Sequence, residues 1–170
     1  LAEAVAACAR LAPPPGRMQR LGGGRAPLVV IDYAHSPDAL EKCLVALRDA
    51  LRPARLVCVF GCGGERDRGK RRPMGEVASR HADLVVLTSD NPRGEDPHAI
   101  IEDILPGVSA PREVHIERRA AIRAALAAAR AGDVVLIAGK GHEPYQEIAG
   151  ERHPFSDADE ARAALEAIAP

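Results

Sequence analysis

The sequence predicts an α/β domain with a Rossmann-like, doubly wound and mainly parallel sheet that carries helices on both faces. Two observations predict this fold. Five short apolar segments rich in β-branched residues recur along the chain, and segments with helical periodicity lie between them. The apolar segments are continuous rather than alternating, which is typical of parallel strands that are covered on both sides.

The first predicted element precedes this pattern. Residues 1–11 carry apolar side chains near helical spacing, and the stretch PPPGR at 13–17 ends any such helix because proline cannot continue its hydrogen bonds. We interpret residues 1–16 as the tail of a preceding domain followed by a hinge, and residues 17–170 as the domain itself.

The remaining elements alternate along the chain. We expect strands at residues 28–33, 56–61, 84–89, 114–117 and 134–139. We expect helices between them, at residues 38–51, 73–81, 97–105 and 118–130. A C-terminal β-hairpin over residues 145–155 turns at Gly150, and residues 156–168 form a last helix with Ser156 as its N-cap.

Composition narrows the function classes. With 46% hydrophobic residues, the 170-residue chain can bury a core without disulfide or metal staples. Aromatic residues make up 2% and the formal net charge is -1, so we do not expect nucleic-acid binding. No apolar run approaches the length of a membrane span, so we do not expect membrane insertion. The four cysteines lack C-x-x-C spacing, so we expect no metal site and a reducing, cytoplasmic location. We also expect a monomer.

Function is predicted at one edge of the sheet. Ligands of open parallel sheets bind beyond the carboxyl ends of the strands. The loops that follow the strands, at residues 34–38, 61–70, 90–96 and 139–146, are polar and conformationally special, whereas the loops that enter the strands are plain. This asymmetry predicts a binding site at the carboxyl edge.

The glycine-rich loop GCGGERDRGKR at residues 61–71 has several interpretations. Its residues 64–70 fit the first seven positions of a phosphate-binding P-loop, but Arg71 stands where that loop needs a hydroxyl for magnesium. Its glycines are not spaced as G-x-G-x-x-G, which argues against a dinucleotide site. Arg66 and Arg68 suit an anionic ligand. A solvated loop with local ion pairs is the alternative.

The loop SDNPRGED carries the next candidates. Asp90, Asn91 and Arg93 surround Pro92, which fixes one backbone dihedral and stiffens the turn. A stiff turn with a guanidinium group suits recognition of a carboxylate. The alternative is an ordinary Asx-Pro turn that caps the following helix.

The remaining two loops are weaker signals. In AGKGHE, Gly139 lets the backbone approach a ligand closely and Glu143 suits an ammonium group. Lys140 in the same loop either contacts phosphate or is solvated. In DYAHSPD, His35 is either a ligand contact or part of a helix start that Ser36 or Asp38 caps.

Six segments taken together indicate a family. In chain order, PGRM, DYAHSPDAL, GCGGERDRGKR, SDNPRGEDP, AGKGHEPYQ and FSDADEA resemble the C-terminal domain of the Mur ligases. The resemblance covers nearly the whole chain, and its most specific motif is D-N-P-R at residues 90–93, which marks the members that add meso-diaminopimelate rather than lysine.

The resemblance implies an ATP-dependent amide ligase of peptidoglycan synthesis. Such an enzyme phosphorylates a carboxyl group of UDP-N-acetylmuramoyl-L-alanyl-D-glutamate with ATP, and the amine of meso-diaminopimelate then attacks the acyl phosphate. By the same resemblance, the P-loop, the Mg²⁺ ligands and the UDP-binding domain lie upstream, and no match to them occurs in this chain. We therefore expect this chain to be inactive alone.

The resemblance also implies the roles of individual residues. The positions that match the family's meso-diaminopimelate site are Arg66, Asp90, Asn91, Pro92, Arg93, Gly139 and Glu143. The positions that match ATP contacts are Arg17, Asp32, Tyr33 and His35. Arginines would hold the carboxylate at the remote end of diaminopimelate, and Glu143 would hold the ammonium group there. Lysine lacks that carboxylate, so such a site should reject it.

Alternatives remain open at this point. A lysine-adding Mur ligase or a folylpolyglutamate synthetase-like ligase would share the fold and would differ in its amino-acid preference. A non-catalytic binding module is the alternative from another class. In the ligase interpretation, the segment PPPGR is the pivot about which the domain closes over ATP.

Overall fold

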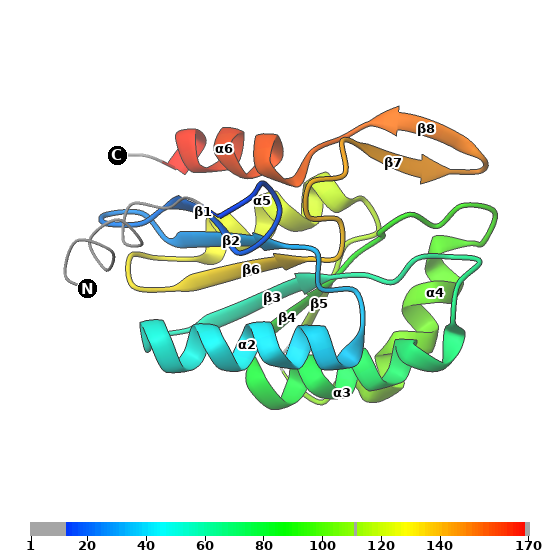
Figure 1. Cartoon of the computed structure of the whole chain (residues 1–170), viewed down its shortest axis with the longest axis horizontal. Helices are drawn as coiled ribbons and strands as arrows, with labels where there is room; N and C mark the ends of the chain where they lie inside the picture. The colour runs from blue at the N-terminus through cyan, green and yellow to red at the C-terminus, as the bar shows by residue number, and fades with distance from the viewer. Residues whose placement is uncertain (1–12, 111, 169–170) are drawn as a thin grey trace, which may run out of the picture.

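The computed structural model describes residues 13–110 and 112–168, and it is built around one mixed sheet (Figure 1). The strands follow the spatial order β1-β2-β6-β3-β4-β5. In that order they span Gln19–Gly22, Leu28–Asp32, Val134–Ala138, Leu56–Phe60, Leu84–Leu87 and Arg112–Val114. All neighbours are parallel except β1, which runs antiparallel to β2 at the edge.

Helices cover both faces of the sheet. One face carries α2 (Pro37–Leu51), α3 (Arg71–His81) and α4 (Pro97–Ile104), and the other carries α5 (Arg118–Ala128) and α6 (Asp157–Ile168). Two short 3-10 helices, η1 (Arg68–Lys70) and η2 (Leu105–Gly107), precede α3 and follow α4. The doubly wound α/β prediction is therefore confirmed. No helix of the described ranges is long and apolar enough to cross a membrane.

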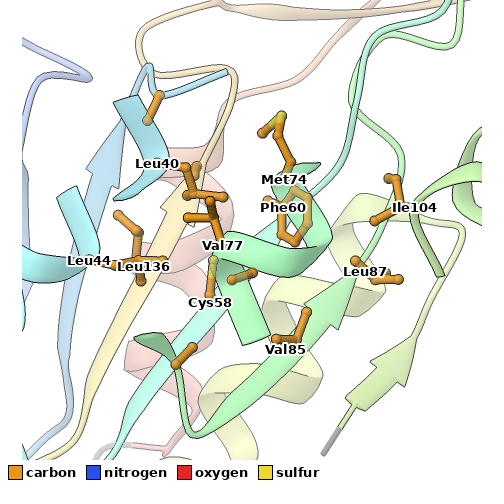
Figure 2. Packing of buried hydrophobic residues seen from close by; sticks show 14 of the residues in the cluster. Leu40, Leu44, Cys58, Phe60, Met74, Val77, Val85, Leu87, Ile104 and Leu136 are labelled. Atoms are coloured by element: carbon orange, nitrogen blue, oxygen red, sulfur yellow. The ribbon is translucent and has the colours of Figure 1, made fainter. Parts of the chain in front are cut away.

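The central strands are apolar throughout because each face meets a helical layer. On β3, Cys58 and Phe60 pack toward the α2–α3–α4 layer, whereas Val57 and Val59 pack toward α5 and α6. Figure 2 shows the first of these cores, where Phe60 lies beside Met74 of α3 and Leu40 of α2 lies nearby. The sheet is thereby fixed as a rigid base for the loops at its carboxyl edge.

The C-terminal hairpin was predicted correctly. It consists of β7 (Tyr145–Ile148) and β8 (Glu151–Pro154), which pair antiparallel about Gly150. Gly150 has a φ of 81°, in the left-handed region that glycine adopts without strain. The hairpin extends beyond the carboxyl edge of the main sheet (Figure 1), so its first strand borders the loops in which function was predicted.

Helix starts follow the predicted capping chemistry. Ser36 is the N-cap of α2 and its Oγ accepts a hydrogen bond from Ala39 N at 3.4 Å, so Asp38 is not the cap. Ser156 caps the start of α6 in the same way, because its Oγ accepts a hydrogen bond from Asp159 N at 3.3 Å.

Two strand predictions need correction. The strand expected at 114–117 is instead β5 at Arg112–Val114; His115 N still bonds to Leu87 O, but Glu117 is already the N-cap of α5. The edge strand β1 was not predicted, because its four residues QRLG carry a single apolar side chain. The helix expected within residues 1–11 lies outside the described residues.

Candidate functional site

A pocket of about 410 Å³ opens at the carboxyl edge of the sheet. It is lined by Tyr33, His35, Gly61, Gly63, Arg66, Asp67, Lys70, Asp90, Asn91, Arg93, Gly139, Glu143 and Tyr145. These residues come from the four loops that follow β2, β3, β4 and β6, together with the start of β7. The structure thus brings together eight of the predicted site residues, while Arg17, Asp32 and Pro92 lie outside the lining.

The glycines of the loop after β3 are required by contact with the loop after β4. A Cβ on Gly61 would lie 2.0 Å from the carbonyl oxygen of Thr88, and one on Gly64 would lie 1.9 Å from that of Pro92. Gly64 also donates its N–H to the Asn91 carbonyl at 2.9 Å. The two loops therefore form one packed unit, and this packing accounts for Gly61 and Gly64.

Arg71 stands where a P-loop would carry a hydroxyl, and it is fully buried. Its guanidinium group binds Glu95 at 2.9 Å and Asp103 at 2.8 Å. Glu95 also accepts a hydrogen bond from the backbone N–H of Glu65, and this bond together with Arg71 lowers the pKa of the Glu95 carboxyl. Arg71 therefore joins the glycine loop to α4 rather than facing a phosphate.

The Asn91 side chain organises one wall of the pocket. Its Oδ1 accepts hydrogen bonds from Lys140 Nζ at 2.8 Å and from Glu147 N at 3.0 Å, and its Nδ2 donates to Glu143 Oε2 at 2.9 Å. Lys140 is fully buried and also binds Glu143 Oε2 at 3.1 Å. The expectation of a solvated or phosphate-binding Lys140 is therefore wrong, and its ammonium group instead fixes the Glu143 carboxylate.

The turn of the D-N-P-R motif is held by the hairpin. Arg93 has a φ of 54°, and its N–H and carbonyl bond to Glu147 O at 3.0 Å and Ala149 N at 2.7 Å. This pairing forms a parallel bridge between Arg93 and Ile148 of β7, and it holds the unfavourable backbone conformation of Arg93 in place. The turn therefore does more than cap α4, which has Asp96 as its own N-cap.

Asp90 and Gly139 meet at the floor of the pocket. Asp90 is mostly buried, and its Oδ1 accepts the N–H of Asn91 at 2.7 Å. A Cβ on Gly139 would lie 2.5 Å from Asp90 Oδ2, and Gly139 has a φ of 116°. Both the space and the backbone conformation at this position require glycine.

Arg66 is the exposed cation of the pocket. Its only described hydrogen bond is to the neighbouring carbonyl of Glu65, at 3.1 Å. With Arg93 it supplies two guanidinium groups, and three carboxylates also line the pocket, those of Asp67, Asp90 and Glu143. A pocket with both charges suits a ligand that carries carboxylate and ammonium groups together.

The four residues matched to ATP contacts lie beside one another near the predicted hinge. The guanidinium carbon of Arg17 lies 5.0 Å from the centre of the Tyr33 ring, and the His35 ring lies 4.7 Å from it. The Asp32 carboxylate is held by the backbone, because it accepts hydrogen bonds from Met18 N at 2.9 Å and Ala34 N at 2.8 Å.

Sequence reasoning missed three features of the site. Lys70 and Tyr145 line the pocket, and Lys70 Nζ donates to the His35 carbonyl at 2.8 Å. The segment predicted as a hinge also packs against the loop after β6, since a Cβ on Gly16 would lie 2.1 Å from His142 N. Glycine next to proline in PPPGR was the available signal for that close approach. Within the described residues, no three His, Cys, Asp or Glu side chains gather as metal ligands would.

Comparison with known proteins identifies the family of this chain. The family model described as Mur ligase, glutamate ligase domain, matches residues 16–141. A protein of Chromobacterium violaceum named UDP-N-acetylmuramoyl-L-alanyl-D-glutamate--2,6-diaminopimelate ligase is 61% identical over 170 residues, which cover 98% of this chain and 34% of that protein. The ligase of the same name from Acidovorax sp. (strain JS42) is 61% identical over 169 residues, with 97% and 34% covered.

A solved structure leads to the same family. The structure of a ligase of that name has a TM-score of 0.85 and 48% sequence identity, and the match covers 93% of this chain and 33% of that chain. This chain therefore spans about a third of the length of the relatives it matches. On the strength of the family model and these relatives, the chain belongs to the Mur ligase family, in which it corresponds to the C-terminal, glutamate ligase domain.

Proposed function

We propose that this chain is the amino-acid-binding domain of an ATP-dependent ligase that adds meso-diaminopimelate to UDP-N-acetylmuramoyl-L-alanyl-D-glutamate. One observation carries the proposal: a single pocket gathers the guanidinium groups of Arg66 and Arg93 and three carboxylates, those of Asp67, Asp90 and Glu143. The relatives named as diaminopimelate ligases support it, because they match almost the whole chain.

The proposed ligand matches these charges. Meso-diaminopimelate carries a carboxylate and an ammonium group at each end. We assign the carboxylate of the non-reacting end to Arg93 and Arg66, and its ammonium group to Glu143, whose carboxylate Asn91 and Lys140 hold in place. The amine of the other end would then attack the activated carboxyl of the dipeptide, forming the amide as phosphate leaves.

ATP is proposed to approach from the hinge side. Arg17, Tyr33 and His35 offer a cation and two aromatic rings there, which suit phosphate and ribose or base contacts. Asp32 would position these residues through Met18 and Ala34 rather than bind ATP itself. The family members' P-loop and Mg²⁺ ligands are expected in the upstream part of the protein, so the inactivity of this chain alone, the monomeric state and the cytoplasmic location stay predictions.

Amino-acid preference tests the proposal. The intact ligase that contains this chain is assayed with ATP and the UDP-dipeptide, and meso-diaminopimelate and L-lysine are compared at equal concentration. We expect diaminopimelate to be preferred by about 100-fold to 10⁴-fold in kcat/KM, because lysine leaves the guanidinium groups without their carboxylate. Preference for lysine would overturn the proposal. The purified chain alone, assayed in parallel, should form no product.

A further inference from the structure

A fully buried ion pair lies directly behind the pocket. Arg118, the first residue of α5, donates from Nε and Nη2 to the two carboxylate oxygens of Asp157, the first residue of α6, at 2.7 and 2.8 Å. Both side chains are fully buried. Neither residue lines the pocket.

The same guanidinium group holds the roots of two pocket loops. Arg118 Nη1 donates to the carbonyl oxygen of Ser89 at 3.2 Å, and Nη2 donates to that of Ala138 at 3.0 Å. These residues immediately precede Asp90 and Gly139, with which the two loops begin. Their strands, β4 and β6, are not neighbours in the sheet, because β3 lies between them. Arg118 therefore ties together two loops that no strand ladder joins directly.

Stability alone is a poor explanation for this arrangement. Removing two charges from water is costly, and a buried ion pair often stabilises a fold no better than apolar residues of the same volume. Burial by itself would lower the pKa of Arg118, but the carboxylates of Asp157, Asp90 and Glu143 together outweigh burial and raise that pKa. A positive charge thus lies beneath two of the pocket carboxylates, Asp90 and Glu143.

We propose that Arg118 is a positioning residue for the amino-acid pocket. Held by Asp157, it sets the spacing between the turn that carries Asn91 and Arg93 and the turn that carries Glu143. Two hydrogen bonds between these turns depend on this spacing: Asn91 donates to Glu143 at 2.9 Å and accepts from Lys140 at 2.8 Å. This inference rests on the proposed function, because the spacing would control amino-acid binding; the KM for the amino acid is therefore the quantity to measure.

The test uses the intact ligase with Arg118→Lys and Asp157→Asn. Lysine keeps the positive charge but cannot donate to a carboxylate and two carbonyls in the same fork, and asparagine keeps the shape of Asp157 without its charge. We expect each variant to raise the KM for the amino acid by about tenfold, because small misplacements of binding groups are costly. The KM for ATP should stay within about twofold of wild type.

Asp133→Asn is the matched control. Its carboxylate is also buried and pairs with Arg55 at 2.7 Å, but it precedes Val134 at the opposite end of β6. This variant should lower the melting temperature and leave the KM for the amino acid unchanged. A purely structural role for Arg118 predicts the same behaviour in its own variants, so an unchanged KM with a lowered melting temperature would overturn the inference.

The wild-type enzyme is assayed first, with both meso-diaminopimelate and L-lysine. The amino acid that it uses better then serves as the substrate for all variants. A preference for lysine would therefore overturn the proposed function while the KM comparison still decided the role of Arg118. If Arg118→Lys does not fold, Asp157→Asn decides alone, and an unchanged KM in that variant counts against positioning.

Discussion

The guanidinium group of Arg93 donates a hydrogen bond of 2.8 Å from Nη1 to the carbonyl oxygen of Gly64. Gly64 lies in the loop after β3 and Arg93 in the loop after β4, and Gly64 also donates its own N–H to Asn91 in that second loop. The two loops are joined in both directions, so the pocket is partly preorganised by its own lining residues. Substitution of Arg93 should weaken ligand binding, whereas substitution of Gly64 should lower the stability of the fold.

Arg93→Ala removes a proposed partner of the ligand carboxylate. We expect the KM for diaminopimelate in the intact ligase to rise by about 100-fold, because hydrogen bonds to charged groups contribute about 1.5 to 3 kcal/mol each. The KM for ATP should change little. Steady-state kinetics with each substrate varied in turn measures both.

Arg72→Ala is the control for this substitution. Arg72 is an exposed arginine that pairs with Glu76 on the surface of α3, away from the pocket lining. Its removal should leave both KM values near those of wild type. Equal losses for the amino acid and ATP in Arg93→Ala would contradict the assigned role of Arg93.

Gly64→Ala introduces a methyl group where no room exists. The added Cβ would lie 1.9 Å from the Pro92 carbonyl oxygen, and that atom belongs to the backbone of a stiff turn. We expect the free energy of unfolding to fall by about 1 to 3 kcal/mol, the usual cost of overpacking. Urea denaturation of the purified chain measures it.

Gly69→Ala provides the comparison within the same loop. Its Cβ would meet only the side chain of Asp67, at 3.1 Å, and that side chain is exposed. The expected loss of stability is below about 1 kcal/mol. Similar losses in the two variants would show that the contact between the loops does not explain Gly64.

The described cysteines should resist alkylation in the native chain. Burial, and for Cys43 also the nearby Asp32 carboxylate, raises the pKa of Cys43 and Cys62 to about 12 and raises the pKa of Cys58 as well. A pKa near 12 leaves roughly one thiol in 10⁴ as reactive thiolate at pH 8. Peptide mass spectrometry after iodoacetamide treatment should find these three unmodified, and fully modified in urea. Fast labelling of native Cys58 would contradict its burial.

The sequence predicts best what depends on local pattern. The strand within 56–61 could be located because a continuous apolar run of strand length admits few alternatives, and Ser36 could be proposed as a cap because capping is a contact over three residues. The loops of the site could be located because parallel strands share one carboxyl edge. The strand expected at 114–117 was misplaced because β5 has only three residues.

What the sequence could not predict depends on distant partners. Lys140 was expected to contact phosphate or to be solvated, and no sequence pattern singled out Arg118, since buried charges are rare unless they are paired. Their partners, Asn91 and Asp157, lie 49 and 39 residues away in sequence. Only the folded arrangement brings an amide or a carboxylate to them, so the electrostatic support of the pocket is visible in the structure alone.

Asp133 should make the stability of the chain depend on pH in acid. Burial raises the pKa of its carboxyl, but hydrogen bonds from Arg55 at 2.7 Å and from Arg130 N at 2.9 Å outweigh burial, so the folded-state pKa lies below the usual value. A carboxyl whose pKa is lower in the folded state than in the unfolded state stabilises the chain at pH values above the unfolded-state pKa of about 4. That contribution is lost as the pH falls through the lower, folded-state pKa.

Asp133→Asn therefore has a distinctive signature. The variant should be less stable than wild type at pH 6, and the difference in unfolding free energy should shrink as the pH falls from about 5 toward 2, because wild type loses the contribution that the variant never had. Urea denaturation at a series of pH values measures this difference. Asp38→Asn serves as the control, since Asp38 pairs with Lys42 on the surface with three quarters of its side chain exposed, and such pairs contribute little at any pH. A difference for Asp133→Asn that stayed constant across this range would mean that the variant acts through packing and not through the charge of the carboxylate.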